Sequence, residues 1–143
     1  YEESPEYVSV LTVSGEVAST VVSVSATMSR KGPVLVEILG HDVELPISRH
    51  LLILRNADVP GVIGRVGTFL GDAGINIANM VVGRSRVTND AAMMGLNLDQ
   101  PMTESQVAQL RLLPGIEEAR YIEVEHIRAD QPHFVQGRLA FPT

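Results

Sequence analysis

From residue 50 onward, the chain alternates between strand-like and helix-like patterns in the order strand, helix, strand, strand, helix, strand. The first strand, residues 51–54, is an uninterrupted apolar run, which is typical of a central strand buried on both faces. Pro60 stands at the start of the next helix, where a missing N–H is tolerated, and Gly74 follows the end of that helix as a left-handed cap. This order predicts a ferredoxin-like βαββαβ unit over residues 50–125.

The later elements of this unit carry their own boundary signals. Residues 75–82 and 91–98 are predicted to be two paired strands. Thr103 and Gln106, three residues apart, form a capping box that begins the second helix. Residues 116–124 complete the unit as its last strand.

Residues 1–49 show an alternation of period two instead of a helical period. Within residues 20–28, apolar side chains occupy every second position: Val22, Val24, Ala26 and Met28. We therefore expect a β-meander of about four strands in residues 1–49. Residues 126–143 show no sustained period and contain two prolines and a glycine, so we expect an irregular C-terminal tail there. The predicted fold class is α+β, a β-meander followed by the βαββαβ unit.

Composition excludes several classes of protein. At 143 residues and 45% apolar content, the chain can form one ordinary core or two small ones. A net charge of −6 without a Lys/Arg cluster argues against binding to nucleic acid or to an anionic membrane. The absence of a roughly 20-residue apolar run and of a signal peptide favours a cytoplasmic protein. The absence of cysteine excludes disulfides and thiol chemistry, and a first residue of Tyr suggests a piece of a longer chain.

The first helix of the unit has an unusual glycine-rich face. Four glycines share one arc of a helical wheel, opposite the apolar residues: Gly61, Gly64, Gly67 and Gly71. Each glycine in an exposed helix costs roughly 0.8–1 kcal/mol relative to alanine. We therefore expect a packed backbone or a bound ligand to approach this face closely.

The residues around the start of this helix combine groups that suit a zwitterionic ligand. The N–H groups and the positive dipole end of the helix suit a carboxylate. Asp58, just ahead of the helix, can accept from an α-ammonium group, and Asn76, at the entry to the next strand, can hydrogen-bond the ligand. Purely structural roles are the alternative, with Asp58 capping the helix and Asn76 shaping a turn.

No catalytic or metal-binding pattern accompanies these residues. The segment from Gly61 to Gly64 lacks the first G-x-G of a nucleotide-binding loop and follows a proline. The four histidines, at positions 41, 50, 126 and 133, show neither an i, i+4 pair nor a cluster with carboxylates. We therefore predict no catalytic residue, no cofactor site and no metal site in this chain.

The segment from Asp58 to Gly64, taken with residues 72–77, resembles the ACT-domain signature. The flanking residues 54–56, 80–84 and 113–116 resemble 3-phosphoglycerate dehydrogenase in particular. In that family, ACT domains pair side by side into a larger sheet, and serine binds between two subunits. The resemblance implies the regulatory, feedback-inhibited region of an enzyme whose catalytic domains, which bind NAD, lie outside this chain.

Carried over by position, the resemblance implies L-serine or another small amino acid as effector and a homo-oligomer as the binding form. The implied effector contacts are the side chains of Asn56, Asp58 and Asn76 and the backbone of Gly61, Val62 and Ile77. Residues 1–49 resemble the end of an intervening domain, in which Arg30, Lys31 and Arg49 are either anion ligands or solvated surface charges. Two alternatives stay open: an ACT domain of L-serine dehydratase, and a ligand-free oligomerisation module.

Overall fold

The computed structural model describes residues 11–14, 24–29, 32–38, 41–84, 91–127 and 135–140, and it places the side chains of residues 44–83 and 92–124. In chain order, the elements are β1 (Leu11–Ser14), β2 (Val24–Ser29), β3 (Gly32–Ile38), β4 (His41–Pro46), β5 (His50–Ala57), α1 (Val62–Asp72), β6 (Ile77–Arg84), β7 (Ala91–Leu98), α2 (Glu104–Arg111), β8 (Ile116–Ile127) and β9 (Val135–Ala140). Within these residues no helix is both long enough and apolar enough to cross a membrane.

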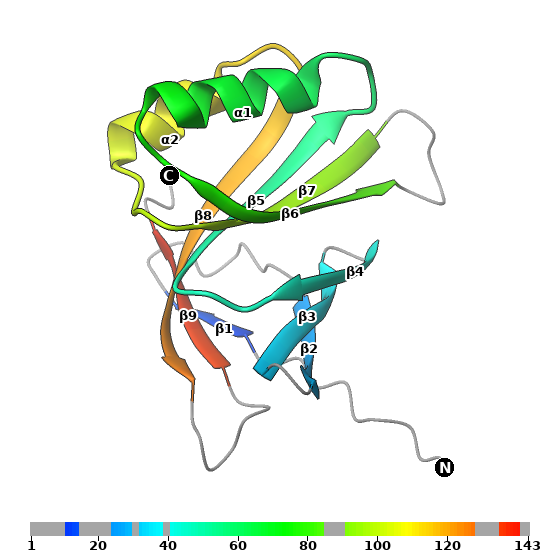
Figure 1. Ribbon diagram of the computed structural model, residues 1–143, viewed down its shortest axis with the longest axis vertical. Helices are drawn as coiled ribbons and strands as arrows, with labels where there is room; N and C mark the ends of the chain where they lie inside the picture. The colour runs from blue at the N-terminus through cyan, green and yellow to red at the C-terminus, as the bar shows by residue number, and fades with distance from the viewer. Residues whose placement is uncertain are drawn as a thin grey trace.

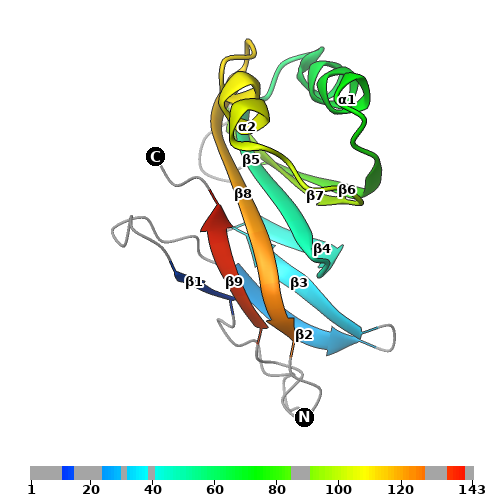
Figure 2. The same ribbon diagram turned by 90° about the vertical axis from the view of Figure 1, so that its left-hand side faces the viewer.

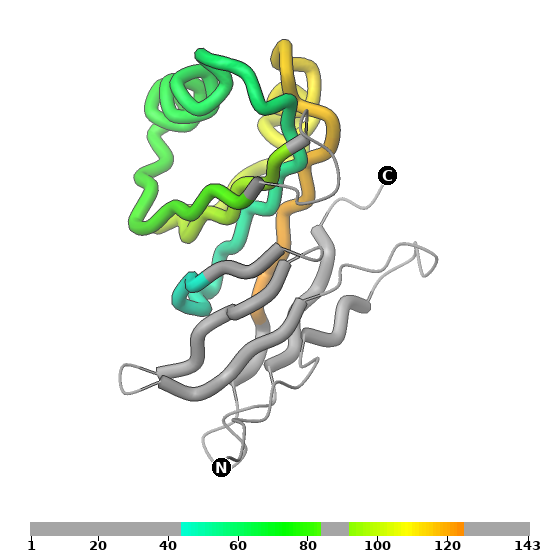
Figure 3. Tube along the Cα trace, turned by 90° about the vertical axis from the view of Figure 1, so that its right-hand side faces the viewer, coloured from blue at the N-terminus to red at the C-terminus, as the bar shows by residue number. Residues whose placement is uncertain are grey.

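The described strands form two sheets (Figure 1). The larger sheet has the order β1-β9-β8-β5-β7-β6, and the smaller has the order β2-β3-β4. Strands β8, β5, β7 and β6 lie side by side in that order, and each is antiparallel to its neighbours within this set. Numbered within the βαββαβ unit, this is the strand order 4-1-3-2. Both helices cover the same face of this sheet (Figures 2 and 3). The predicted α+β fold with a ferredoxin-like βαββαβ unit is therefore confirmed.

Strand β5 lies at the centre of this unit because its residues are apolar on both faces. Leu52 and Leu54 belong to the core beneath the helices, and both side chains are fully buried. Leu51 and Ile53 point to the opposite face, since side chains alternate along a strand, and they are buried there. The continuous apolar run that predicted a central strand thus supplies two layers of packing.

The two helices are capped differently. Helix α1 buries Val62, Val66 and Leu70 at a spacing of four residues, and Gly74 follows it with a φ of 76°. Helix α2 begins with the predicted capping box, in which Gln106 N–H donates to the Thr103 hydroxyl and the Gln106 side chain accepts from Thr103 N–H. Helix α1 has no such cap, because its N-cap residue is a glycine.

Two expectations for the ends of the chain are wrong. Strand β1 does not join the meander, which has three described strands, but pairs in parallel with β9. Residues 126–143 are not irregular throughout, because β8 continues to Ile127 and β9 pairs with it in antiparallel fashion. The physical reason is the open edge of β8, whose backbone N–H and C=O groups need partners that β9 supplies. Arg30 and Lys31, the anion candidates of the first segment, lie outside the described residues.

The connection between β4 and β5 is fastened to the larger sheet. The Asn97 side chain on β7 donates from Nδ2 to Pro46 O at 2.7 Å and to the Ser48 hydroxyl at 2.8 Å. The backbone N–H of Val124 donates to Arg49 O at 2.8 Å. These bonds tie the segment that follows the three-stranded sheet to two separate strands, β7 and β8.

His50 on β5 and Tyr121 on β8 make a further contact near this connection. The Tyr121 hydroxyl lies 2.7 Å from Nδ1 of His50, and the two rings are nearly parallel. Burial raises the pKa of the Tyr121 hydroxyl above its usual value, and a backbone hydrogen bond at Met102 acts in the opposite direction. The first residue of β5 is therefore tied to a buried side chain of β8.

Candidate effector-binding site

The first half of the candidate site lies where β5 passes into α1. The N-cap residue of α1, Gly61, has a φ of 96° and no side chain, and the first turn contains no acidic residue. The dipole end of α1 is therefore uncompensated by a carboxylate in its own first turn. The N-cap of α1 is therefore Gly61 and not Asp58. Asp58 is half-buried three residues ahead of Gly61.

Asn56 provides a second feature at the same end of the sheet. It continues the row of Leu52 and Leu54 on the face that the helices cover. Its side chain is 3% exposed, and Nδ2 donates to Ala57 O at 2.9 Å. Among the described residues its Oδ1 has no hydrogen-bond partner. A buried acceptor without a donor costs about 1–3 kcal/mol, so this atom needs a donor that the described residues do not supply.

The turn after α2 contacts the first turn of α1 and the end of β5. Ala57 N–H donates to Gly115 O at 2.8 Å, and Arg65 donates to Pro114 O at 3.3 Å. Val62 is 1% exposed and packs closely against Gly115. The backbone of Gly61 and Val62, which the sequence assigns to the site, is thereby fixed relative to the end of β5.

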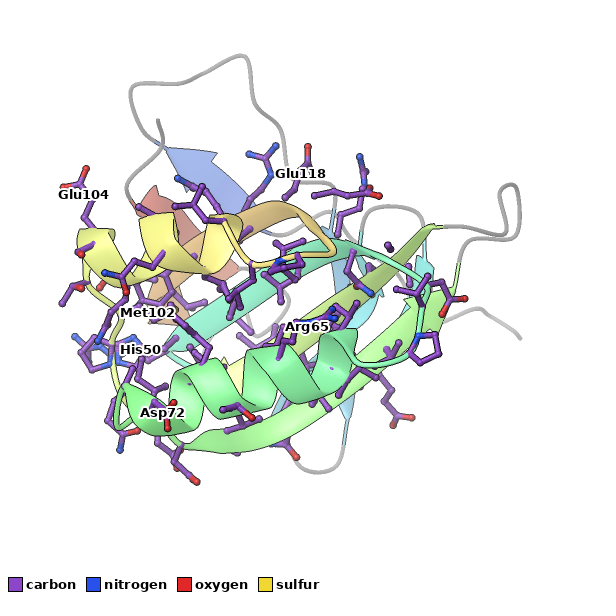
Figure 4. All side chains as sticks on the ribbon, turned by 90° about the horizontal axis from the view of Figure 1, so that it is seen from above. His50, Arg65, Asp72, Met102, Glu104 and Glu118 are labelled. Carbon is purple, nitrogen blue, oxygen red and sulfur yellow. The ribbon has the colours of Figure 1, made fainter. Side chains whose placement is uncertain are left out.

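A groove of about 560 Å³ runs along α1 on the side that faces the end of α2 (Figure 4). Its lining residues are Gly61, Gly64, Arg65, Thr68, Phe69, Asp72 and Leu113. Of the six predicted effector residues, only Gly61 lines this groove. The groove is therefore separate from the two amide side chains, Asn56 and Asn76.

The second half of the candidate site lies at the entry to β6. Asn76 is exposed, and its backbone N–H donates to Oε1 of Gln100 at 2.7 Å. Its side-chain Nδ2 donates to Oδ2 of Asp99 at 2.6 Å, and Asp99 N–H donates to Asn76 O at 3.0 Å. Ile77, the first residue of β6, is half-buried. Sequence reasoning missed Asp99 and Gln100, whose only local signal is a turn before the capping box.

The two halves lie at opposite ends of the sheet within one chain. His50 and Ile77 both pair with Leu98, whereas Asn56 and Arg84 both pair with Ala92. The six steps from Leu98 to Ala92 span about 20 Å at roughly 3.3 Å per residue. The structure thus brings Asn56, Asp58, Gly61 and Val62 together but places Asn76 and Ile77 too far away to contact the same amino acid.

The edge of the sheet beside the site carries exposed apolar side chains. Strand β6 is the edge strand, and α1 lies over it (Figure 2). We use the name edge patch for four exposed side chains of β6, of α1 and of the loop before α1: Val59, Ile63, Met80 and Val82. A Cβ added at Gly64, Gly67 or Gly71 would meet no atom within 4 Å outside the neighbouring helix backbone. The close neighbour expected for these glycines is therefore absent from the described part of this chain.

Two arginines lie close to one carboxylate on the sheet surface. Arg55 and Arg120 lie 3.7 Å and 3.5 Å from the carboxylate of Glu118 on the sheet surface. These partly exposed pairs each contribute at most about 1 kcal/mol. No group of three or more potential metal ligands occurs among the described residues.

Comparisons with known proteins agree on one family. Residues 50–111 match the family model described as the ACT domain. The chain is 38% identical over 101 residues to D-3-phosphoglycerate dehydrogenase of Methanocaldococcus jannaschii, covering 71% of this chain and 19% of that protein. It is 39% identical over 93 residues to that of Bacillus subtilis, covering 65% and 18%. It is 34% identical over 82 residues to that of Synechocystis, covering 57% and 15%. The chain thus spans less than a fifth of the length of these relatives.

Proposed function

From the premise that this chain carries an ACT domain matching the C-terminal region of D-3-phosphoglycerate dehydrogenases, we propose that it is the L-serine-sensing regulatory region of such an enzyme. The binding site rests on one observation: Oδ1 of Asn56 is buried and has no hydrogen-bond partner in the described part of the chain, and the N-cap of the following helix has no side-chain hydrogen bond. The α-ammonium group of an amino acid can donate to Oδ1 of Asn56, and its carboxylate can accept from the N-terminus of α1. A small ligand suits the space because Gly61 has no side chain.

The ligand charges are divided between α1 and the end of β5. The carboxylate accepts from the backbone N–H groups that follow Gly61, where the helix dipole is positive. The α-ammonium group donates to Oδ1 of Asn56 and faces the carboxylate of Asp58. Each contact replaces a hydrogen bond to water, so the net gain per contact is about 1 kcal/mol, and more where one group is charged.

The contribution of Asn76 and Ile77 comes from a second copy of the chain. If two β6 strands pair antiparallel about a twofold axis between Met80 and Val81, Ile77 of one copy lies opposite Arg84 of the other. Arg84 is level with Asn56 in the sheet. This register brings Asn76 of one copy to the end of the sheet at which Asn56 and Gly61 of the other copy lie.

The same pairing gives the exposed apolar groups a partner. Met80 and Val82 pair with Leu96 and Met94, which belong to the core beneath the helices, so both point to the helix face of the edge strand. In the pair, they pack beside Ile63 and the glycine face of the partner's α1. Exclusion of water from the edge patch supplies the association energy.

Regulation follows if serine binds one quaternary arrangement better than another, by a coupling of typically 1–3 kcal/mol. The parent activity is the NAD-dependent oxidation that the names of the relatives imply, and its catalytic groups and NAD lie outside this chain. The same inference extends to cytoplasmic location and to residues 1–49 as the end of an intervening domain. The relatives reported above share one name, which favours this parent over L-serine dehydratase.

Calorimetric titration of the purified chain with L-serine, glycine, L-threonine and D-serine tests this proposal, with the oligomeric state measured in parallel. We expect saturable binding that favours L-serine, its loss in Asp58→Ala, and a weakened but still measurable affinity in Asn76→Ala. Glu44→Ala, which removes one exposed carboxylate on β4, is the charge-matched control and should bind normally. Near-normal affinity in Asp58→Ala would contradict the assignment of the site.

A ligand-free oligomerisation module is the second candidate, because the glycine face and the edge patch need only a second copy. This candidate predicts a dimer whose dissociation constant is the same with and without every amino acid. Sedimentation equilibrium with and without 10 mM L-serine, on the order of a saturating concentration for a millimolar site, separates the two candidates. A dimer strengthened by L-serine favours the sensor.

A further inference from the structure

The asparagine at the entry to β6 is held by more hydrogen bonds than an exposed residue in a turn needs. Asn76 and the segment Asp99–Gln100 exchange three bonds, at 2.6, 2.7 and 3.0 Å. Two use the backbone of Asn76, as donor to Gln100 and as acceptor from Asp99. The third uses its side chain, as donor to the Asp99 carboxylate. Backbone and side chain of Asn76 are therefore fixed by a single neighbouring loop.

The chemistry of the third bond decides which way the amide of Asn76 points. An ionised carboxylate accepts hydrogen bonds and donates none, so only the NH₂ end of the amide can face Asp99. The carbonyl end, Oδ1, must then face away from the carboxylate. Without Asp99 the amide can rotate by half a turn and present either a donor or an acceptor at that position.

We propose that Asp99 is a positioning residue that locks Asn76 with Oδ1 outward, as an acceptor for the α-ammonium group of an effector held mainly by a second copy of the chain. This inference rests on the function proposed above, because it takes that site as the place where Asn76 acts. It adds a residue to the site and assigns the polarity of the contact. The contact selects ligands with a donor at this position, such as an α-amino acid, over ligands with only acceptors.

The role of Asp99 differs from that of a direct ligand, and substitutions can separate the two. In Asp99→Asn, the new side chain keeps an oxygen that can accept from Nδ2 of Asn76, although it loses the negative charge. In Asp99→Ala, both the acceptor and the charge are absent. A positioning residue therefore tolerates Asn and not Ala, whereas a residue that pairs with the ammonium by charge tolerates neither.

The test is calorimetric titration of the chain with L-serine in five forms: wild type, Asp99→Ala, Asp99→Asn, Asn76→Ala and the double variant Asp99→Ala/Asn76→Ala. We expect an affinity about 10-fold weaker in Asp99→Ala, the loss typical of one hydrogen bond to a charged group. We expect Asp99→Asn to stay within about threefold of wild type, and the double variant to bind no more weakly than Asn76→Ala. Unchanged dimer affinity and thermal unfolding midpoints in the single variants assign these losses to the site, and Glu44→Ala serves as the charge control.

Each departure from this pattern overturns a defined step. Wild-type affinity in Asp99→Ala removes the positioning role and leaves the serine site intact. Equal losses in Asp99→Asn and Asp99→Ala, or a further loss in the double variant, show that Asp99 acts directly on the ligand. If wild type binds none of the amino acids, the proposed function and this inference fail together.

Discussion

Gly115 offers the sharpest test of how the first turn of α1 is held. Its φ is 93°, a backbone conformation that costs an L-residue about 1–2 kcal/mol. A Cβ at this position would lie 2.7 Å from Cγ2 of Val62, whose side chain is 1% exposed and cannot move into solvent. Overpacking of this kind costs about 1–3 kcal/mol. We therefore expect Gly115→Ala to lower the free energy of unfolding by about 2–5 kcal/mol.

Gly74 is the matched control for the backbone contribution. Its φ of 76° also lies in the left-handed region, but a Cβ there would meet no atom within 4 Å. Gly74→Ala should therefore cost only the backbone strain of about 1–2 kcal/mol. The difference between the two variants, about 1–3 kcal/mol, is the contribution of the contact with Val62.

Urea unfolding followed by circular dichroism measures these losses as shifts of the midpoint at constant slope. The double variant Gly115→Ala/Val62→Ala adds a second check, because removal of the Val62 methyl groups leaves room for the new Cβ. We expect it to be more stable than the sum of the two single losses predicts. Equal losses for Gly115→Ala and Gly74→Ala, together with additive losses in the double variant, would refute the proposed contact.

Two further substitutions test the helix face and the buried tyrosine. Gly67→Ala should stabilise the isolated chain by about 0.5–1 kcal/mol in urea unfolding, because the position is open, and should weaken the dimer in sedimentation if a second copy packs there. For Tyr121, the folded-state pKa is raised above the usual 10.0, so the unfolded chain loses its phenolic proton first. The contribution of Tyr121 to the free energy of unfolding is therefore fully present below about pH 10, and it is lost as the pH rises through the folded-state pKa. Tyr121→Phe should remove that fall in urea midpoints measured from pH 8 to 11; an unchanged slope would contradict the role of burial.

The predictable parts of the fold depend on short stretches of sequence. The capping box at Thr103, the left-handed Gly74 and the apolar run of β5 each specify a local conformation through neighbouring residues. Their order then leaves one common arrangement for a βαββαβ chain. The pairing of β1 with β9 could not be predicted from local patterns. The two strands are more than a hundred residues apart in the sequence, and no periodic pattern indicates that they pair.

For the candidate site, the sequence predicted the kinds of residue involved but not their positions relative to one another. Asp58, Asn76 and the predicted start of a helix indicate a zwitterionic ligand from the sequence alone, whereas Asn56 was implied only by the family resemblance. The separation of Asn76 from Asn56 and Asp58 follows from topology, because α1 returns the chain to the end of the sheet where β5 began. Asp99 is 23 residues from Asn76 in the sequence, and only the pairing of β6 with β7 brings the two together.

A site divided between two copies makes effector binding and assembly a single equilibrium. On the proposed arrangement, one copy supplies Asn56, Asp58 and the start of α1, and the other supplies Asn76, so the dimer binds the amino acid more tightly than the monomer. In the limit that only the dimer binds, an effector concentration 100 times the dissociation constant stabilises the dimer by about 2.7 kcal/mol per site, and two equivalent sites double that effect. The doubled value exceeds the 1–3 kcal/mol typical of allosteric coupling. Strand β5 is packed on both faces, so the proposed regulation needs no deformation of the sheet and can act through the relative position of the two copies.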